Sequence, residues 1–140
     1  MKINKYRAFN KKTKKFQYFT LEDCFNSTGG YLGDYLSSDE IENITDYTNR
    51  KDKNNKEIYE NDVIRSLESC NKGQYYSYDT VEYIGGGFSP LYCNGCEATT
   101  KVEDMEVVGN IYENPELIKV VEKSIQSERL GEPEILKDIK

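Results

Sequence analysis

The sequence has 140 residues, a formal net charge of −6 and no histidine. This length suits one domain, or two small lobes that share a core. The net negative charge argues against direct, sequence-independent binding to nucleic acid. The lack of histidine removes the side chain that most often serves as a general base near neutral pH, which disfavours an enzyme.

The sequence contains no apolar run of the length that a signal peptide or a membrane span needs. We therefore expect a soluble, cytoplasmic protein that does not act at a membrane. Its cysteines are then expected to be reduced thiols, because disulfides are rare in the cytosol. They are Cys24, Cys70, Cys93 and Cys96.

Charge is distributed unevenly in the first third of the chain. Residues 1–20 carry seven lysines and arginines and no acid, whereas residues 21–49 carry seven acids and no base. The two blocks could be solvated faces of one globule. They could also be complementary patches that pair between subunits, since opposite potentials steer association.

The first elements in chain order are two predicted strands, over residues 2–9 and 15–20, joined by a polar turn. Thr20 and Ser37 each precede an acidic residue by three positions, Asp23 and Glu40. This spacing is typical of a helix N-cap, so a short helical turn is predicted after each of them.

The middle of the chain reads as antiparallel β structure. The Asn-rich segment 51–56 predicts a tight hairpin turn before a strand start at Ile58. Further strands are predicted over residues 63–67, 75–84 and 101–108, with Gly85-Gly86-Gly87 as a hairpin turn rather than a phosphate loop.

Asn114-Pro115-Glu116 predicts the start of a helix, with Asn114 as its N-cap. Gly131 is its candidate C-cap. The apolar positions that form one stripe at helical spacing are Leu117, Ile118, Val121 and Ile125. We therefore divide the chain into a mainly β region of residues 1–113, in one or two small lobes, a helix of the same domain over residues 114–131, and a charged tail over residues 132–140.

Two separate stretches resemble motifs of the YopX family of phage and prophage proteins. They are YTNRKDKNNKEIYENDVI over residues 47–64 and VVGNIYENPEL over residues 107–117. Tyr6-Arg7-Ala8-Phe9 and Val81-Glu82-Tyr83 also resemble the family. The resemblance implies a mostly β fold of small SH3-like barrel lobes with a C-terminal helix packed on them, and homo-oligomers in the cytoplasm of a bacterial host. It implies no catalytic residues.

Asparagine stands where the family usually has glycine, at Asn49, Asn55 and Asn61. Asparagine is the other residue that best tolerates a positive φ, so a left-handed backbone is predicted at all three positions. We interpret the motif residues as scaffold. They are Tyr47, Asn49, Asp52, Asn55, Ile58, Tyr59, Glu60, Asn61, Asp62, Gly109, Asn110, Tyr112, Asn114 and Pro115.

A binding surface is predicted in the segments 29–38 and 75–96, which lie outside the motifs and are rich in aromatic residues. Its candidate residues are Tyr31, Tyr35, Tyr75, Tyr76, Tyr78 and Phe88. The alternative is that these side chains belong to the core or to a subunit interface.

The pattern Cys93-Asn94-Gly95-Cys96 is how a tetrahedral thiolate site commonly begins. No second such pair follows, so Cys93 and Cys96 are weak metal candidates, and plain turn cysteines are the main alternative. We predict no cofactor and no metal.

These features favour a non-enzymatic phage accessory protein that self-associates and binds a host or phage component. One alternative is a counter-defence protein that sequesters a nucleotide-like ligand in a pocket between lobes or subunits. Another is an inhibitor that presents its acidic stretch to a basic nucleic-acid-binding host factor.

Overall fold

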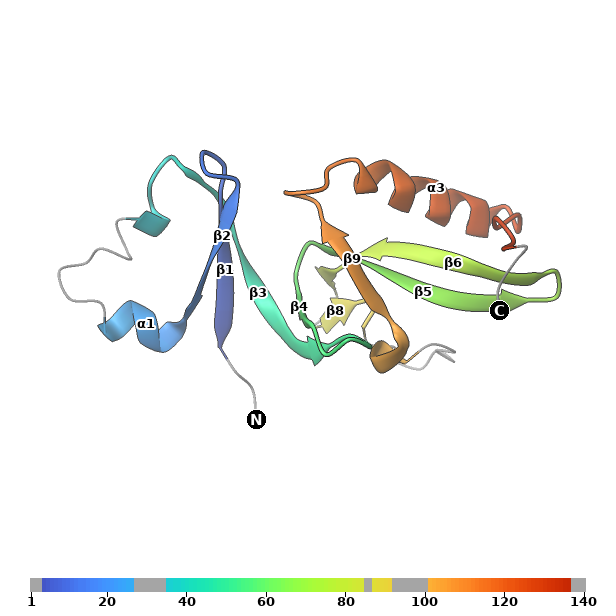
Figure 1. Ribbon diagram of the computed structural model, residues 1–140, viewed down its shortest axis with the longest axis horizontal. Coiled ribbons are helices and arrows are strands. Elements are labelled where there is room, and N and C mark those ends of the chain that lie inside the picture. Colours follow the sequence, from blue (N-terminus) through green and yellow to red (C-terminus); the bar gives the residue numbers. More distant parts are fainter. Residues whose placement is uncertain (1–3, 27–34, 85–86, 92–100, 137–140) are drawn as a thin grey trace.

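The computed structural model describes residues 4–26, 35–84, 87–91 and 101–136 (Figure 1). The strands are β1 (Lys5–Asn10), β2 (Lys15–Thr20), β3 (Ile41–Lys51), β4 (Glu57–Tyr59), β5 (Asp62–Cys70), β6 (Gly73–Thr80), β7 (Glu82–Ile84), β8 (Gly87–Ser89) and β9 (Glu106–Asn110). The helices are α1 (Leu21–Asn26), the 3₁₀ helix η2 (Val102–Asp104) and α3 (Leu117–Arg129).

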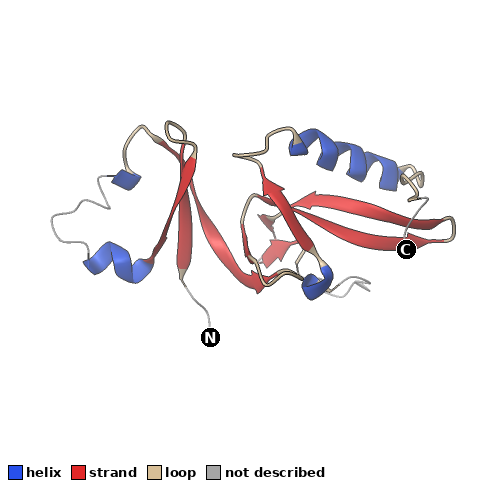
Figure 2. Ribbon diagram, viewed as in Figure 1, coloured by secondary structure: helices blue, strands red, loops and turns tan. Residues whose placement is uncertain are grey.

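Strands dominate the fold, and α3 is its longest described helix (Figure 2). The predicted mostly β fold with a C-terminal helix is confirmed. One sheet has the strand order β2-β1-β3-β4, a second β6-β5-β9, and β7 pairs with β8. In the described residues these sheets are open rather than closed into barrels, because β2 and β4 form the two edges of the first sheet and do not pair with each other.

The long strand β3 joins the two halves of the molecule. It pairs with β1 in the N-terminal sheet and reaches across to β4 (Figure 1). On the other side α3 runs along the β5–β6 hairpin (Figure 1). The described chain therefore forms two lobes, one around β1–β3 and one around β5, β6, β9 and α3.

Of the two helix starts predicted in the N-terminal lobe, one is confirmed and one is wrong. Thr20 and Asp23 exchange the two hydrogen bonds of a capping box, so the predicted helix start at Thr20 is confirmed. The predicted helical turn after Ser37 is wrong. The Ser38 hydroxyl donates back to the carbonyl of Tyr35, and β3 begins at Ile41.

The basic and acidic blocks lie side by side where β1 pairs with β3, and an ion pair between them lies beside this contact. Lys12 Nζ lies 3.4 Å from Glu40 Oε1, and both side chains are exposed. An exposed pair of this kind contributes little to stability. The blocks thus have a contact within one chain, and pairing between subunits stays a prediction.

The three Asn-for-Gly positions have a left-handed backbone, as predicted. The φ angles are 64° at Asn49, 63° at Asn55 and 71° at Asn61. Asn49 lies within β3, where its register with β4 shifts, and Asn55 and Asn61 lie in turns, so the residue type at each position suits the backbone. The predicted turn between β3 and β4 is thereby confirmed.

Two predicted strands in the C-terminal lobe are shorter than expected. The stretch 75–84 breaks at Val81, which is fully buried and whose amide donates to the carbonyl of Asp62. The stretch 101–108 begins with η2, and its strand starts only at Glu106. Val81 and Val102 are apolar because they fill the core, not because they extend a strand.

This core lies between β4, β5, η2 and the segment that carries Leu91. Its buried members are Ile58, Ile64, Val81, Leu91, Val102 and Met105. Phe88 and Val107 pack against it. The lobe is thus held by apolar burial, the main favourable term in folding.

Helix α3 begins at Leu117, later than predicted. Asn114 is not its N-cap, because its Oδ1 accepts a hydrogen bond from the Asn110 amide instead. The predicted C-cap is confirmed, since Gly131 has a φ of 69°. The predicted stripe is only partly correct, because Val121 is buried whereas Ile118 is 40% exposed.

The described part of the tail contacts the sheet. The Leu136 amide donates to the carbonyl of Gln74, and Ile135 forms a bridge to Tyr75 at the edge of β6. In the described part of the chain, no helix is both long and apolar enough to cross a membrane.

Candidate functional site

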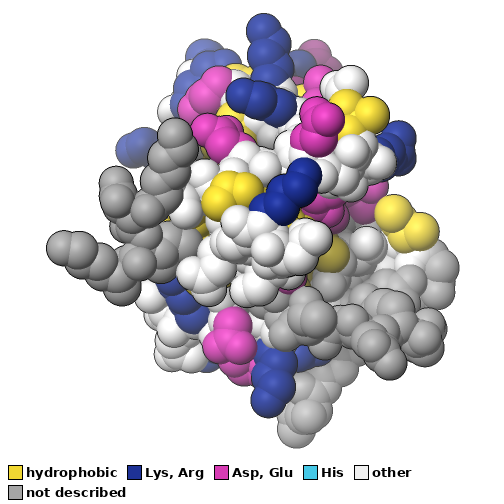
Figure 3. Space-filling model, turned by 90° about the vertical axis from the view of Figure 1, so that its right-hand side faces the viewer, with side chains coloured by type: hydrophobic (Ala, Val, Ile, Leu, Met, Phe, Trp, Pro, Cys, Tyr) yellow, Lys and Arg dark blue, Asp and Glu magenta, His cyan; other side chains and the backbone are white. Residues whose placement is uncertain are grey.

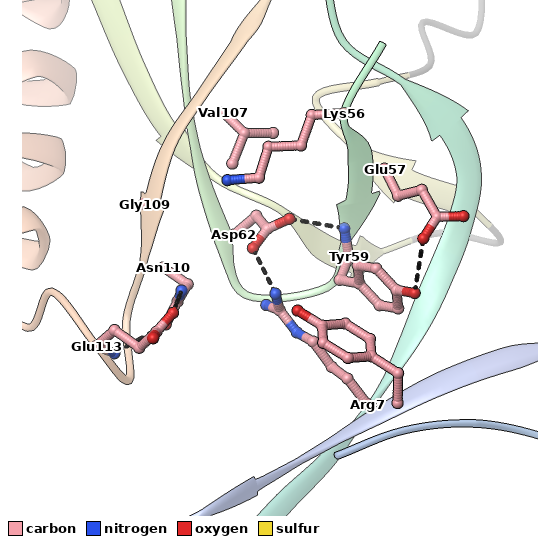
Figure 4. Close-up of a pocket in the computed structure, with 10 residues that line it drawn as sticks. Arg7, Lys56, Glu57, Tyr59, Asp62, Val107, Gly109, Asn110 and Glu113 are labelled. Atoms are coloured by element: carbon pink, nitrogen blue, oxygen red, sulfur yellow. Dashed lines mark hydrogen bonds and ion pairs between the residues drawn. The ribbon is translucent and has the colours of Figure 1, made fainter. Parts of the chain in front are cut away.

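A cavity of about 190 Å³ lies between the two lobes (Figure 4). Strands β1, β2, β4, β5 and β9 all contribute to its walls. The described residues that line it are Arg7, Tyr18, Lys56, Glu57, Tyr59, Asp62, Val107, Gly109, Asn110 and Glu113. Most of them belong to the two motifs singled out in the sequence.

A buried ion pair forms one wall of this interlobe cavity. Arg7 Nη1 lies 2.8 Å from Asp62 Oδ1, and the two side chains are only 4% and 3% exposed. Arg7 also donates from Nε to Thr45 Oγ1 and from Nη2 to the carbonyl of Glu60. Because a buried charge is costly unless it is paired and hydrogen-bonded, these contacts make the pair structurally possible.

Aromatic rings enclose the guanidinium group. Arg7 Cζ lies 4.3 Å from the ring centroid of Phe16 and 4.9 Å from that of Tyr59. Tyr18 packs edge-on against Tyr59, with the centroids 5.5 Å apart. The rings exclude water from the charge and add cation–π attraction.

Tyr59 and Glu57 continue the network towards the surface. The Tyr59 hydroxyl donates to Glu57 Oε1, and the Tyr59 amide donates to Asp62 Oδ2 (Figure 4). Glu57 Oε2 in turn lies 2.7 Å from Lys5 Nζ. These contacts fix the positions of four side chains, Lys5 on β1, Glu57 and Tyr59 on β4, and Asp62 on β5.

Burial raises the pKa values of three acid groups in and beside this network, those of Tyr59, Tyr18 and Asp62. It raises the pKa of Tyr59 well above its usual range, and the negative charge of Glu57 adds to the effect. Burial also raises the pKa of Tyr18, although Arg7 opposes this. Likewise it raises the pKa of Asp62, and Arg7 offsets only part of the increase. Both phenols thus stay protonated at neutral pH, and the Tyr59 hydroxyl acts as a hydrogen-bond donor.

The charges of the interlobe cavity do not suit a polyphosphate ligand. Its described lining carries three carboxylates, from Glu57, Asp62 and Glu113, against the two cations Arg7 and Lys56. This balance disfavours a polyphosphate. The pKa values of both phenols are raised, which does not favour their ionised forms.

The second motif meets the first at the far side of the cavity. Asn110 Oδ1 accepts from the amides of Tyr112 and Glu113, which holds the turn after β9. The Tyr112 hydroxyl accepts from Asn61 Nδ2 at 2.8 Å, and its ring stacks on Phe9. Tyr112 thereby connects the β9 turn with the N-terminal sheet.

Comparison with known proteins assigns the family. A family model described as YopX protein matches residues 5–119. The chain belongs to the YopX family. No curated protein matches the sequence. Among solved structures, the crystal structure of protein EF1440 from Enterococcus faecalis is similar, with 22% identity, a TM-score of 0.49, and coverage of 81% of this chain and 96% of that one.

Two further YopX motif residues make contacts between β9 and other parts of the chain. Asp52 Oδ2 accepts from the Val107 amide, and Asp52 Oδ1 accepts from the amides of Asn54 and Lys56. A Cβ on Gly109 would lie 2.5 Å from Asn114 Oδ1 and 2.7 Å from Leu117 Cδ1. Only glycine therefore lets the start of α3 approach β9 without a shift.

Other motif residues lie in the core or at turns. Ile58 is fully buried, and Tyr47 packs against Tyr59 with the centroids 5.3 Å apart. The Glu60 amide donates to the carbonyl of Asp46. The Pro115 carbonyl accepts from the Ile118 amide at the entry to α3.

The candidate surface tyrosines of this YopX chain do not form one site. Tyr31 lies outside the described residues, and the Tyr35 hydroxyl accepts from Asn10. Tyr75, Tyr76 and Tyr78 line a separate cavity of about 150 Å³ beside α3.

Two of these candidates have partners within the fold. Arg65 Cζ lies 4.3 Å from the Tyr76 ring centroid, and the Tyr78 amide donates to Ser124 Oγ. Phe88 packs against the core and edge-on to Tyr83, with the centroids 5.2 Å apart.

The metal candidates Cys93 and Cys96 lie outside the described residues. Cys24 and Cys70 are free thiols. The described ranges hold no group of three or more side chains placed to bind a metal ion.

Arg7 and Tyr18 are the important residues that sequence reasoning missed. Arg7 was counted as one of several exposed bases in the first twenty residues. A signal was present, since Arg7 lies within a predicted strand between Tyr6 and the apolar pair Ala8-Phe9. An arginine in that setting requires a carboxylate partner.

Proposed function

We propose that this YopX-family chain is a non-enzymatic binding module of phage or prophage origin, which self-associates and acts on a host or phage protein in the bacterial cytoplasm. The main support is that the polar centre built by the motifs is buried and internally paired, with Arg7 and Asp62 at 4% and 3% exposure. Such a centre stabilises the fold and leaves partner contacts to the surface. The surface carries large aromatic side chains, including Tyr18 and Tyr83.

We expect partner binding at the β7–β8 hairpin rather than at the end formed by the C-terminal lobe. At the end formed by the C-terminal lobe, charged side chains of both signs are interspersed and hydrophobic ones are scattered (Figure 3). Partner surfaces usually concentrate aromatic and apolar side chains. The β7–β8 hairpin, with Tyr83 at 60% exposure and Ile84 at 53%, fits this description better.

The proposal predicts two measurable properties. Size-exclusion chromatography with light scattering at micromolar concentration should give a mass above the 16.2 kDa of one chain. Affinity purification of the tagged chain from infected cells should recover a specific protein. A monomer that recovers no specific protein would overturn the proposal.

Two matched variants separate binding from folding. Tyr83→Ser should reduce partner recovery while the melting temperature stays unchanged, because this ring is largely exposed. Tyr59→Ala should lower the melting temperature first, because this ring is buried beside Arg7. Equal loss of stability in both variants would count against a surface role.

Salt dependence distinguishes the kind of partner. A basic nucleic-acid-binding factor held by the acidic stretch should be released steeply as salt rises, whereas an aromatic contact should persist. Nucleotide sequestration stays a prediction, and a thermal-shift panel of nucleotides tests it. The charge balance of the interlobe cavity argues against that place for it.

A further inference from the structure

A second cavity, also of about 190 Å³, opens between the N-terminal sheet and the β7–β8 hairpin. We call it the aromatic recess. Its described lining is Asn4, Lys5, Tyr6, Asp46, Tyr47, Tyr83 and Phe88. Four of these residues are aromatic, and they come from strands β1, β3, β7 and β8. None of these four rings lines the interlobe cavity, so the recess is a separate feature of the described chain.

The recess already holds one ammonium group against a ring. Lys5 Nζ lies 5.6 Å from the ring centroid of Tyr47. Its charge is paired outside the recess with Glu57 Oε2, at 2.7 Å. The ring face of Tyr47 is thus oriented towards a cation, and Lys5 does not leave an unpaired positive charge there.

The described lining carries one carboxylate, that of Asp46, and one ammonium group, that of Lys5. Glu60 lies outside this lining, close enough to Asp46 and Glu82 for their charges to act on it. Burial and the negative charge of Asp46 raise the pKa of Glu60. In the described part of the chain, none of these three acids forms an ion pair with a lysine or arginine. The recess therefore combines aromatic faces with the carboxylate of Asp46, while Lys5 is paired with Glu57.

We propose that the aromatic recess binds the cationic head of a lysine or arginine side chain presented by a partner protein. Aromatic rings attract ammonium and guanidinium groups through their negative faces, and a neighbouring carboxylate adds a charge-assisted hydrogen bond. The volume of about 190 Å³ suits such a head group and is below that of most sites for drug-sized ligands. The inference deepens the proposed function and rests on it, because it names the chemistry of the partner.

The test is an NMR titration of the full chain, observed through the ring signals of labelled tyrosine. The probes are Nα-acetyl-arginine amide and Nα-acetyl-lysine amide, and the neutral control is Nα-acetyl-citrulline amide. We expect saturable shifts of the Tyr6 and Tyr83 rings with the cationic probes only. Equal shifts with citrulline, or no shifts at millimolar probe, would overturn the proposal. Binding of choline without binding of either amino-acid amide would overturn it too, since the occupant would then be a quaternary ammonium ligand rather than a lysine or arginine side chain.

Variants assign the binding to the recess. Tyr83→Ala and Asp46→Asn should each weaken the cationic probe by about two- to fivefold, as expected for one exposed ring or charge. Tyr76→Ala is the control, because the Tyr76 ring belongs to β6, packs on Arg65 and lies outside the recess. An equal effect of all three variants would place the probe elsewhere and refute the inference.

The outcome is separable from that of the proposed function. If the chain is monomeric and recovers no partner, but the cationic probes still bind, the proposed function fails and the recess chemistry stands. If the chain recovers a partner whose binding Tyr83→Ala and Asp46→Asn leave unchanged, the proposed function stands and the recess inference fails.

Discussion

Removing the guanidinium of Arg7 should be among the most destabilising single changes in this protein. Arg7→Met keeps an unbranched apolar stem but leaves the Asp62 carboxylate buried without its cation, which in the wild type lies 2.8 Å away. Breaking a buried pair in this way costs about 3–5 kcal/mol, out of a total stability of roughly 5–15 kcal/mol for a small domain. The loss should appear as a clear decrease in the midpoint of urea unfolding, followed by circular dichroism at a fixed protein concentration.

The pH dependence of the same variant supplies an independent check. Without Arg7 the pKa of Asp62 in the folded state should rise further above its unfolded value of about 3.9. An acid with a raised folded pKa stabilises fully below the unfolded pKa, and this contribution is lost as pH rises through the folded pKa. The difference between wild type and Arg7→Met should therefore shrink as pH is lowered towards 4.

Two controls make the reasoning refutable. Arg7→Met with Asp62→Asn should recover much of the loss, because the amide oxygen can still accept from the Tyr59 amide and no charge remains buried. Lys5→Met breaks the more exposed pair with Glu57 and should cost less than about 1 kcal/mol. The reasoning is refuted if Arg7→Met costs no more than Lys5→Met. It is also refuted if the stability lost in Arg7→Met does not shrink at acid pH, because the Arg7–Asp62 ion pair would then not stabilise the fold.

Asn61→Gly should lower stability by about 1 kcal/mol in urea unfolding, because it removes the 2.8 Å hydrogen bond to Tyr112. Asn55→Gly is the control and should be nearly neutral, because it keeps a positive-φ turn and removes no such bond. Equal effects of the two variants would contradict a specific role for the bond. Glu106 should support stability above its unfolded pKa of about 4.3, since partial burial is outweighed by the hydrogen bond and charge of Arg65, which hold the pKa of Glu106 below its usual range. That support should be lost as pH falls through the lowered pKa, so Glu106→Gln should flatten the decrease in melting temperature below pH 5, and an unchanged profile would refute the assignment.

Features governed by local backbone chemistry were predictable from the sequence. The left-handed backbone at Asn49, Asn55 and Asn61 followed from the exchange of one permissive residue for another. The capping box at Thr20 and the glycine cap at Gly131 likewise depend on neighbours a few positions away. Local signals of this kind survive folding because few distant groups compete for the same atoms.

Predictions failed where a distant or unexpected partner took over a polar group. Asn114 has the sequence of an N-cap, but the amide of Asn110 occupies its side-chain oxygen. The setting of Arg7 in a strand beside Ala8 and Phe9 indicates burial and a carboxylate partner, but Asp62 and Glu60 lie beside it only after the two lobes have met. No periodicity links such residues, so the sequence does not show which carboxylate is the partner. The aromatic recess was missed for the same reason, because its rings come from four separate strands.

The spacing of the partners in the network also determines when the protein can fold during its synthesis. Arg7 bonds a carbonyl 53 residues further along the chain, and Asn61 bonds Tyr112 at a separation of 51 residues. At a translation rate of about 5–20 residues per second, each of these partners emerges roughly 3–10 s after the group that waits for it. The nascent chain therefore carries an unpaired arginine until Asp62 has been made, and the face of Phe9 that stacks on Tyr112 stays uncovered until most of the protein has been made. The N-terminal lobe thus depends on later parts of the chain for some of its packing, although it forms a separate lobe in the finished molecule.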